Sequence, residues 1–139
     1  MTNVQLAAKV GLSASPCLTR VRALEDAGVI VGRVALIDAR KLGSYVSVFI
    51  QVTLEKQVEP ALGSFEASVA RFAEVMECYL MTGDADYLLR VVVGDIDALQ
   101  EFIVGRLSKI RGVANIRSSF ALKQVKYKTA LPLERLLAK

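Results

Sequence analysis

The acidic turn Gly83-Asp84-Ala85-Asp86 has the residue types in this sequence that are best suited to chemistry. It lies between two apolar runs, Val75–Thr82 and Tyr87–Val93. Glycine accepts positive φ angles and aspartate can bond its own backbone, so the pattern is typical of a hairpin turn between two strands. Two carboxylates beside an open glycine backbone would also suit a small-ligand site. By itself, the segment fits either a plain turn or such a site.

The composition limits the class of protein to which this sequence can belong. The chain has 139 residues, of which 53% are hydrophobic and 23% are charged. This is too apolar for a disordered chain, and the length allows one domain or two small ones. No apolar run reaches the roughly 18 residues of a membrane span, and the N-terminus lacks the apolar core of a signal peptide. We therefore expect a cytoplasmic protein without a membrane partner.

The chain contains no histidine, which narrows the chemistry further. Ser-His and Cys-His catalysis are excluded, and a zinc site would have too few ligands. We interpret Cys17 and Cys78 as reduced, structural thiols. Asp84 and Asp86 could act as acid and base, but no nucleophile, metal-ligand cluster or phosphate loop accompanies them. The sequence predicts a protein that is not an enzyme and carries no cofactor or metal.

The elements around the turn form two similar halves. Residues 45–54 alternate between an apolar face and a second, mixed face, which predicts a strand. We expect helices over 60–73 and 95–111, strands over 75–82, 87–93 and 113–122, an extended basic stretch over 123–128 and a short helix over 132–137. Asp95 should cap the second helix, whose predicted apolar stripe is Ile96, Leu99, Ile103, Leu107 and Ile110. The order is βαββαβ.

This order predicts a ferredoxin-like domain, in which helices cover one face of a four-stranded antiparallel sheet. The other face should then be open. Its expected residues are Phe49, Tyr79, Met81 and Phe120 or a neighbour of Phe120. An open face this apolar favours a partner sheet, so we expect a homodimer and higher assembly.

The first third of the chain holds most of the positive charge. Residues 1–44 contain six basic and three acidic residues, against twelve and eleven in residues 45–139. A short helix is expected over Val4–Val10 with Asn3 as its cap, and a second over Pro16–Ala27 with Ser15 as its cap and Gly28 as its end. Cys17, Val21 and Leu24 should face a core. These are the parts of a helix-turn-helix.

Two segments resemble the Lrp/AsnC (feast/famine) family of transcription regulators. NVQLAAKVGLSASPCLTRVRALEDAGVI is similar to the family's DNA-binding segment, including its L-S-x-x-x-C-x-x-R-V-x-x-L-E-x-x-G-x-I pattern, and ECYLMTGDADYLLRV is similar to its G-D-x-D-Y hairpin. The resemblance covers essentially the whole chain. It implies an α+β protein with an incomplete N-terminal winged helix-turn-helix domain (1–38), a linker (39–44) and a ferredoxin-like effector-binding and oligomerisation domain (45–139).

The resemblance also implies a recognition helix in the major groove of double-stranded promoter or operator DNA. Val29–Asp38, which is strand-like, would be the wing or connecting strand. A single arginine on such a helix could simply be solvated, whereas a cluster favours base and phosphate contacts. The residues expected to contact DNA are Ser13, Ser15, Pro16, Thr19, Arg20, Arg22 and Arg33.

The family's effectors are free amino acids, held between dimers by the acidic loop and by a strand that corresponds to Ser118-Ser119-Phe120. Asp84 or Asp86 would take the α-ammonium group, and Gly83 would free backbone N–H groups for the α-carboxylate or serve the turn alone. Leu80 and Ile96 would line an apolar side chain or only fill the core. The expected effector-binding residues are Leu80, Thr82, Gly83, Asp84, Asp86, Tyr87, Ile96, Ser118, Ser119 and Phe120.

The resemblance therefore predicts a DNA-binding transcriptional regulator whose assembly, as a homodimer that builds an octamer, and DNA binding respond to an amino acid. Family members usually carry one more helix before the pair found here, whereas this sequence begins at Met1-Thr2-Asn3. A shortened chain, a mis-set start codon or a natural truncation would each explain this. The alternative is a stand-alone amino-acid-sensing or oligomerisation module without independent DNA binding.

Overall fold

The computed structural model describes residues 1–38, 41–43 and 45–137. The chain forms two compact units, Met1–Asp38 and Ala39–Lys139. Within the described ranges, no helix combines the length and the apolar character that crossing a membrane requires. Of the predicted linker, only residues 41–43 are described, and positions 39, 40 and 44 lie outside the described residues.

The first unit contains the predicted helix pair, α1 (Asn3–Lys9) and α2 (Ala14–Asp26). The prediction that Asn3 caps α1 is wrong, because Thr2 is the N-cap residue. Its Oγ1 accepts a hydrogen bond from the Gln5 N–H at 3.3 Å, and Gln5 Oε1 accepts one from the Thr2 N–H at 2.8 Å. This capping box satisfies two backbone donors at once. Asn3 instead ties the helices together, since its Nδ2 donates to the Ala14 carbonyl at 2.8 Å.

Helix α2 begins earlier than predicted. Ser13 is its N-cap residue, so Ser15 and Pro16 lie inside the first turn rather than at the cap and the first helical position. Gly28, at a φ of +69°, closes the helix as predicted. Cys17 is buried, but Leu24 is 44% exposed and does not reach a core. Two helices alone leave part of each apolar stripe without cover within this unit.

The prediction of a strand over Val29–Asp38 is also wrong. The segment forms no strand, and apolar side chains such as Val31 and Val34 are exposed. A strand is stable only when a neighbouring strand pairs with its backbone N–H and C=O groups. No strand in the described part of this unit offers that pairing, so the apolar pattern alone does not produce a ladder.

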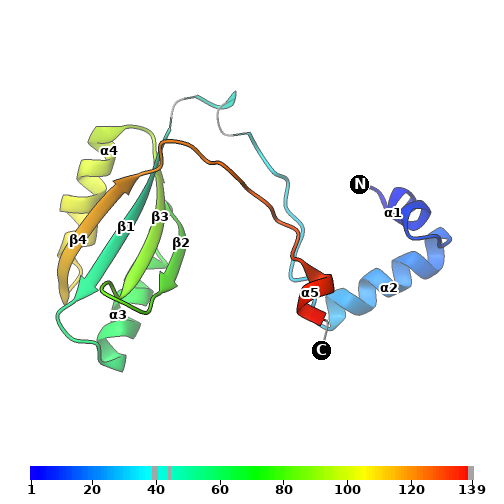
Figure 1. Ribbon diagram of the computed structural model, residues 1–139, viewed down its shortest axis with the longest axis horizontal. Helices are drawn as coiled ribbons and strands as arrows, with labels where there is room; N and C mark the ends of the chain where they lie inside the picture. The colour runs from blue at the N-terminus through cyan, green and yellow to red at the C-terminus, as the bar shows by residue number, and fades with distance from the viewer. Residues whose placement is uncertain (39–40, 44, 138–139) are drawn as a thin grey trace. The chain divides into compact units, whose positions relative to one another are not determined.

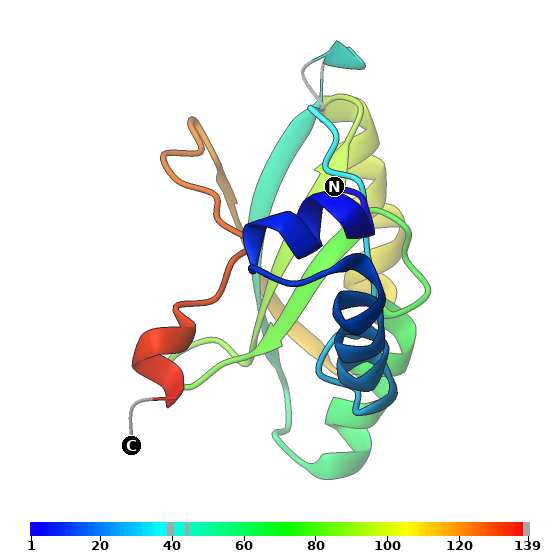
Figure 2. The same cartoon turned by 90° about the vertical axis from the view of Figure 1, so that its right-hand side faces the viewer.

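The second unit has the predicted βαββαβ order and α+β fold. Its strands are β1 (Val46–Leu54), β2 (Val75–Leu80), β3 (Tyr87–Val93) and β4 (Val113–Phe120), arranged antiparallel in the order β2-β3-β1-β4. Figure 1 shows the four strands side by side, and Figure 2 shows α3 (Glu59–Val69) and α4 (Ile96–Gln100) on the same face of the sheet. After β4 the chain continues without helix or strand to a short helix, α5 (Leu133–Leu137).

The core lies between the sheet and its helices. Every second residue of β1 and β3 points into it, as the alternation along both strands predicts. The largest fully buried side chains are Tyr87, Phe65, Phe102, Ile50, Leu89, Leu107, Val48, Val52 and Val91.

The second helical segment is not one regular α-helix. Asp95 caps α4 as predicted, because its Oδ1 accepts from the Ala98 N–H at 2.8 Å. The chain then forms a π-helical turn, η2 (Glu101–Arg106), and a 3₁₀ turn, η3 (Leu107–Lys109). Of the predicted stripe, Leu99 and Leu107 are buried and Ile103 and Ile110 pack against the core. Ile96, the first residue of α4, is instead 55% exposed, and Phe102, outside the predicted stripe, is fully buried. The step from Phe102 to the next buried residue, Leu107, is five residues, which is one π turn.

The open face of the sheet is apolar in part, as predicted, since Phe49, Tyr79 and Met81 are all exposed. Of the two alternatives predicted for β4, the neighbour of Phe120 and not Phe120 itself lies on the open face. Phe120 pairs with the buried Val48 and therefore shares the helix-covered side of the sheet, while its neighbour Ser119 pairs with Phe49 on the open face. Residues paired across strands share a face, so the register of β4 against β1 decides this.

Candidate functional site: a helix surface and a sheet-end loop

One candidate surface is the exposed side of α2. Ser15, Thr19 and Arg22 follow the i, i+4, i+7 spacing and lie on one side of the helix, opposite the buried Cys17. The Thr19 hydroxyl donates to the Ser15 carbonyl at 3.2 Å. Within the described residues, neither Arg20 nor Arg22 forms an ion pair, so both guanidinium groups are available for phosphates or base edges.

The remaining residues of this predicted set differ in their surroundings. Ser13 and Pro16 are exposed at the start of α2, beside the residues just described. Arg33 lies in the irregular segment after α2, and its Nη2 contacts Glu25 Oε1 at 2.6 Å. An exposed ion pair of this kind contributes at most about 1 kcal/mol. A phosphate could therefore compete for Arg33 at small cost.

The acidic loop between β2 and β3 is held firmly at one of its two acids. The Asp86 backbone N–H donates to the Val52 carbonyl at 3.0 Å, and its carbonyl accepts from the Met81 N–H at 2.8 Å. Its Oδ2 accepts from the Leu54 N–H at 2.7 Å, and the residue is only 6% exposed. Asp86 thus fastens the loop to the end of β1.

The other acid, Asp84, is exposed, as are Thr82 and Gly83. Gly83 has a φ of +118°, a conformation that other residues rarely adopt, although no atom would obstruct a side chain there. The glycine is therefore required by the backbone of the turn and not by crowding. Asp84 presents a free carboxylate next to the exposed backbone of Gly83, which is the arrangement that a ligand with one cationic and one anionic group needs.

Tyr87 faces the core beneath this loop. Its hydroxyl donates to Glu66 Oε1 at 2.7 Å, and its ring lies 4.5 Å from that of Phe65. Burial and the Glu66 hydrogen bond both raise the pKa of Tyr87. The hydroxyl is therefore neutral and already bonded on the helix-covered side of the sheet.

Leu80 and Ile96 do not fill the core, which was one of the two readings of their sequence positions. Leu80 is 60% exposed at the end of β2, where it lines a cavity of about 320 Å³ between β2 and α3. Val69, Val75, Cys78 and Tyr87 also line this cavity. Ile96 is exposed at the first residue of α4, beyond the opposite end of β3.

The structure therefore separates the predicted ligand-binding residues into two groups. Leu80 and residues 82–87 lie at the end of the sheet where β1 finishes. Ile96 lies at the end where β1 starts, and Ser118, Ser119 and Phe120 pair with Ile50, Phe49 and Val48. Between Tyr87 and Ser119 there are three residues along β1 and two strand spacings, which places their backbones about 14 Å apart. One chain alone does not bring both groups around a small molecule.

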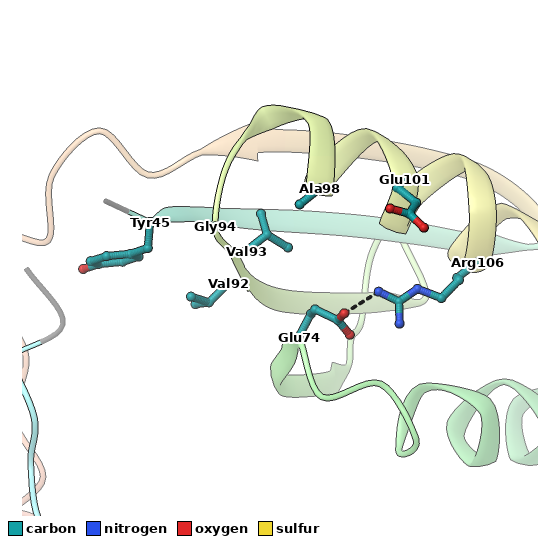
Figure 3. A pocket seen from close by; sticks show the side chains of 8 residues that line it. All are labelled: Tyr45, Glu74, Val92, Val93, Gly94, Ala98, Glu101 and Arg106. Carbon is teal, nitrogen blue, oxygen red and sulfur yellow. Dashed lines mark hydrogen bonds and ion pairs between the residues drawn. The ribbon is translucent and has the colours of Figure 1, made fainter. Parts of the chain in front are cut away.

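A larger cavity, of about 730 Å³, was not predicted from the sequence. Its lining residues are Tyr45, Glu74, Val92, Val93, Gly94, Ala98, Glu101 and Arg106. Figure 3 shows Arg106, from η2, reaching to Glu74, which precedes β2, while Glu101 lies on the helical side. These residues come from four separate segments, and only the fold places them together. The one sequence signal for this cavity is that Glu74 and Arg106 carry opposite charges and lie before and after the apolar segments that line it.

The two cysteines are free thiols, Cys17 buried in the first unit and Cys78 at the surface of β2. No cluster of three metal-ligating side chains occurs in the part of the chain that the structure describes.

Comparisons with known proteins agree with this arrangement. Residues 47–131 match the family model of the Lrp/AsnC ligand binding domain, and residues 1–31 match that of a winged helix-turn-helix DNA-binding domain. A Bkd operon transcriptional regulator from Pseudomonas aeruginosa is 50% identical over 92% of this chain and 84% of its own length. The matched relatives are regulators of transcription and not enzymes.

Two solved structures are similar over 98% of this chain and 88% of their own. One is a transcriptional regulator from Neisseria meningitidis in complex with L-Met, with a TM-score of 0.90 and 39% identity. The other is an AsnC family transcriptional regulator from Agrobacterium tumefaciens, with a TM-score of 0.88 and 43% identity.

Proposed function

Because this chain belongs to the Lrp/AsnC family of transcriptional regulators, we propose that it binds operator DNA through α2 and that a free amino acid, bound by the second unit, controls this binding. In this proposal residues 1–38 form the DNA-binding domain, 39–44 the linker, and 45–139 the effector-binding and oligomerisation domain. The observation that carries the effector half is the acidic loop, in which Asp86 is fastened and Asp84 is free.

The surface of α2 supports the DNA half. Thr19 and Arg22 are exposed on the side of the helix opposite the buried Cys17, and Arg20 is exposed on an adjacent side. Arginine suits both roles needed here, since it pairs with two acceptors on guanine and also neutralises phosphates. Residues 1–44 carry a net charge of +3 by the six basic and three acidic residues, which attracts the DNA backbone. Arg33 adds a phosphate contact when its exposed pair with Glu25 opens.

The loop supports an amino acid as the effector. Asp84 would take the α-ammonium group and the Gly83 backbone the α-carboxylate, with Thr82 as a further donor. Asp86 would act through the loop, because its carboxylate is already bonded to the Leu54 N–H. Leu80 borders a cavity whose apolar lining suits a side chain of an aliphatic amino acid, although Glu66 and Glu77 also line it.

Assembly completes the site in this proposal. Ser118, Ser119, Phe120 and Ile96 lie too far from the loop of their own chain, so those of a second chain would close the pocket. The open sheet face, with Phe49, Tyr79 and Met81 exposed, is the surface that would pair two chains. Dimers would then build the predicted octamer through contacts at the sheet ends.

The effector proposal is tested by a thermal-shift screen of the twenty amino acids on the full chain. A ligand at about 100 times its dissociation constant adds about 2.7 kcal/mol of stability and raises Tm measurably. Asp84→Asn should abolish the shift, whereas Asp97→Asn, an exposed aspartate on α4, should retain it. A flat screen with the wild-type chain would contradict the amino-acid effector.

The DNA proposal is tested separately, by a mobility shift on the chain's own promoter at several salt concentrations. Arg20→Ala and Arg22→Ala should each weaken binding and reduce its salt dependence. Lys109→Ala, in η3 of the other unit, is the matched control and should bind like the wild type. Binding that depends on neither salt nor sequence would contradict the regulator function for this chain.

A second function is favoured by the exposed apolar side chains of the first unit. Val4, Val10 and Leu24 remain open on its two helices, so a stand-alone amino-acid-sensing or oligomerisation module without independent DNA binding is the alternative. The two functions separate cleanly in the experiments above. A positive amino-acid screen with a negative mobility shift would select the module.

A further inference from the structure

The 730 Å³ cavity beside α4 is separate from the acidic loop. It lies at the end of β3 where Val92, Val93 and Gly94 leave the sheet, whereas the loop precedes the start of the same strand. None of the residues predicted to bind the effector lines it. Its walls combine three charged side chains with an apolar floor (Figure 3), which is the composition of a small-molecule site.

The positive charge in this cavity is paired with one of its two carboxylates. Arg106 Nη2 donates to Glu74 Oε1, and the guanidinium carbon lies 5.4 Å from the ring centroid of Phe72 and 5.2 Å from that of Phe102. The guanidinium of Arg106 thus has a carboxylate and two aromatic rings as neighbours, and 42% of its side chain is exposed. The hydrogen bond from Arg106 lowers the pKa of Glu74, so this carboxylate is charged.

The negative charge is only partly engaged. Glu74 Oε2 is shielded from solvent and accepts no hydrogen bond from any described residue. Glu101, one turn before Arg106, forms no ion pair within the described part of the chain. Two carboxylates thus face one guanidinium, which leaves one uncompensated negative charge in the cavity. Glu101 is exposed, whereas Glu74 is partly shielded from water, and a shielded charge produces a stronger local potential than one in bulk solvent.

The rest of the lining is suited to a short hydrocarbon body. Val92, Val93 and Ala98 form the apolar part of the wall, and the ring of Tyr45 lies beyond them at one end (Figure 3). An aromatic ring stabilises a nearby cation or packs against methylene groups. A molecule with a cationic head and about four or five carbons would match both halves of the cavity.

We propose that this cavity is a second ligand site, which binds a small aliphatic cation: a primary amine or guanidine that lacks a carboxylate. Its head contacts Glu101 and the negative side of the Glu74–Arg106 pair, and its methylene chain packs on Val93 and Ala98. A zwitterionic amino acid is disfavoured here, because its carboxylate would face two like charges and an arginine that is already paired with Glu74. The site therefore discriminates against the class of molecule proposed for the acidic loop.

Three probes of one shape test the proposal with the full wild-type chain: n-pentylamine, 1-pentanol and pentanoate. Binding is measured by calorimetry at low and moderate salt, and located by NMR of the labelled methyl groups of Val92 and Val93. The amine should bind, and the alcohol and the acid should bind at least about tenfold more weakly. Added salt should lower the affinity for the amine. Equal binding of amine and alcohol, or shifts at the methyl groups of Leu80 in place of Val92 and Val93, would overturn the site.

Glu101→Gln removes the free charge while it leaves the Glu74–Arg106 pair intact. The substitution should lower the affinity for the amine about tenfold and leave the affinity for the alcohol unchanged. Glu134→Gln, on α5, is the matched control and should bind the amine like the wild type. An unchanged affinity in Glu101→Gln would contradict the proposal. Asp84→Asn should also bind the amine normally, so a failure of the acidic loop as an amino-acid sensor would not alter this result.

Discussion

The two acids of the β2–β3 loop should differ sharply when each is replaced by alanine. Asp86→Ala removes the acceptor of the Leu54 N–H, a 2.7 Å hydrogen bond in a residue that is 6% exposed. A hydrogen bond to a charged group contributes about 1.5–3 kcal/mol, and the buried donor that remains cannot reach water. We therefore expect Asp86→Ala to lower the free energy of unfolding by about 2–3 kcal/mol.

For a unit of about 100 residues, 1 kcal/mol corresponds to about 4–8 °C in Tm, so the loss of about 2–3 kcal/mol should lower the Tm of the variant by about 8–24 °C. Asp84→Ala should stay within about 0.5 kcal/mol, because the side chain is exposed and bonds to nothing in the described chain. Asp86→Asn keeps an acceptor oxygen and should fall between the two.

Urea denaturation followed by far-UV circular dichroism measures these differences. All variants must be compared at one protein concentration, since assembly adds stability that depends on concentration. The reasoning is refuted if Asp86→Ala unfolds within about 0.5 kcal/mol of the wild type, or if Asp84→Ala loses as much. Either result would mean that Asp86 does not fasten the loop to β1.

Three further predictions concern the core, the titration of Tyr87 and assembly. Phe102→Ala, at a fully buried side chain, should cost about 3–5 kcal/mol in urea denaturation, whereas Phe120→Ala, at an exposed one, should cost far less. Because the pKa of Tyr87 is raised in the folded state, its contribution to stability is complete below about pH 10 and is lost as the pH rises further; Tyr87→Phe should therefore flatten the alkaline fall of the urea midpoint. Phe49→Asp should dissociate the proposed dimer in light scattering, and an unchanged mass would exclude the open face as the interface.

The strands could be predicted because burial on one side leaves a two-residue period. In β1 and β3 the buried residues alternate without interruption, and both strands begin within one residue of their predicted starts. Val29–Asp38 carries similar residue types, yet forms no strand, because pairing depends on a neighbour that the local sequence does not specify. The sequence left open whether Phe120 or a neighbour lies on the open face for the same reason, since only the pairing of Phe120 with Val48 decides it.

The helix after β3 shows a different limit. The predicted stripe includes Ile96, which is exposed at the first residue of α4, and omits Phe102, which is fully buried. Phe102 and Leu107 are five residues apart and are separated by the π turn over Glu101–Arg106. Arg106 in this turn contacts Glu74, 32 positions away, and a pattern within the helix could not indicate that contact.

The acidic loop shows what a sequence leaves open at a site. Asp84 and Asp86 are chemically identical, and their spacing gives no reason to prefer one as a ligand contact. The fold distinguishes them. The backbone of Asp86 forms hydrogen bonds with Val52 and Met81 and its carboxylate accepts one from Leu54, while Asp84 is exposed to solvent. The 730 Å³ cavity could not be predicted from the sequence, because Glu101 and Arg106 lie 27 and 32 positions after Glu74 in the chain. The three side chains meet only in the folded unit.

Strand β1 determines how the proposed effector site must work. It holds the acidic loop at its last residues through Val52 and Leu54, and Ser119 near its first residues through Phe49. Its length keeps these groups about 14 Å apart, farther than one amino acid spans. If both groups contact the effector, they belong to different chains, so effector binding and assembly are linked. Linkage is reciprocal: an effector that needs two chains must strengthen their association by the factor by which association strengthens effector binding. Phe49→Asp leaves the acidic loop intact. The variant should therefore lose effector affinity at the same time as its assembly dissociates and the particle mass falls.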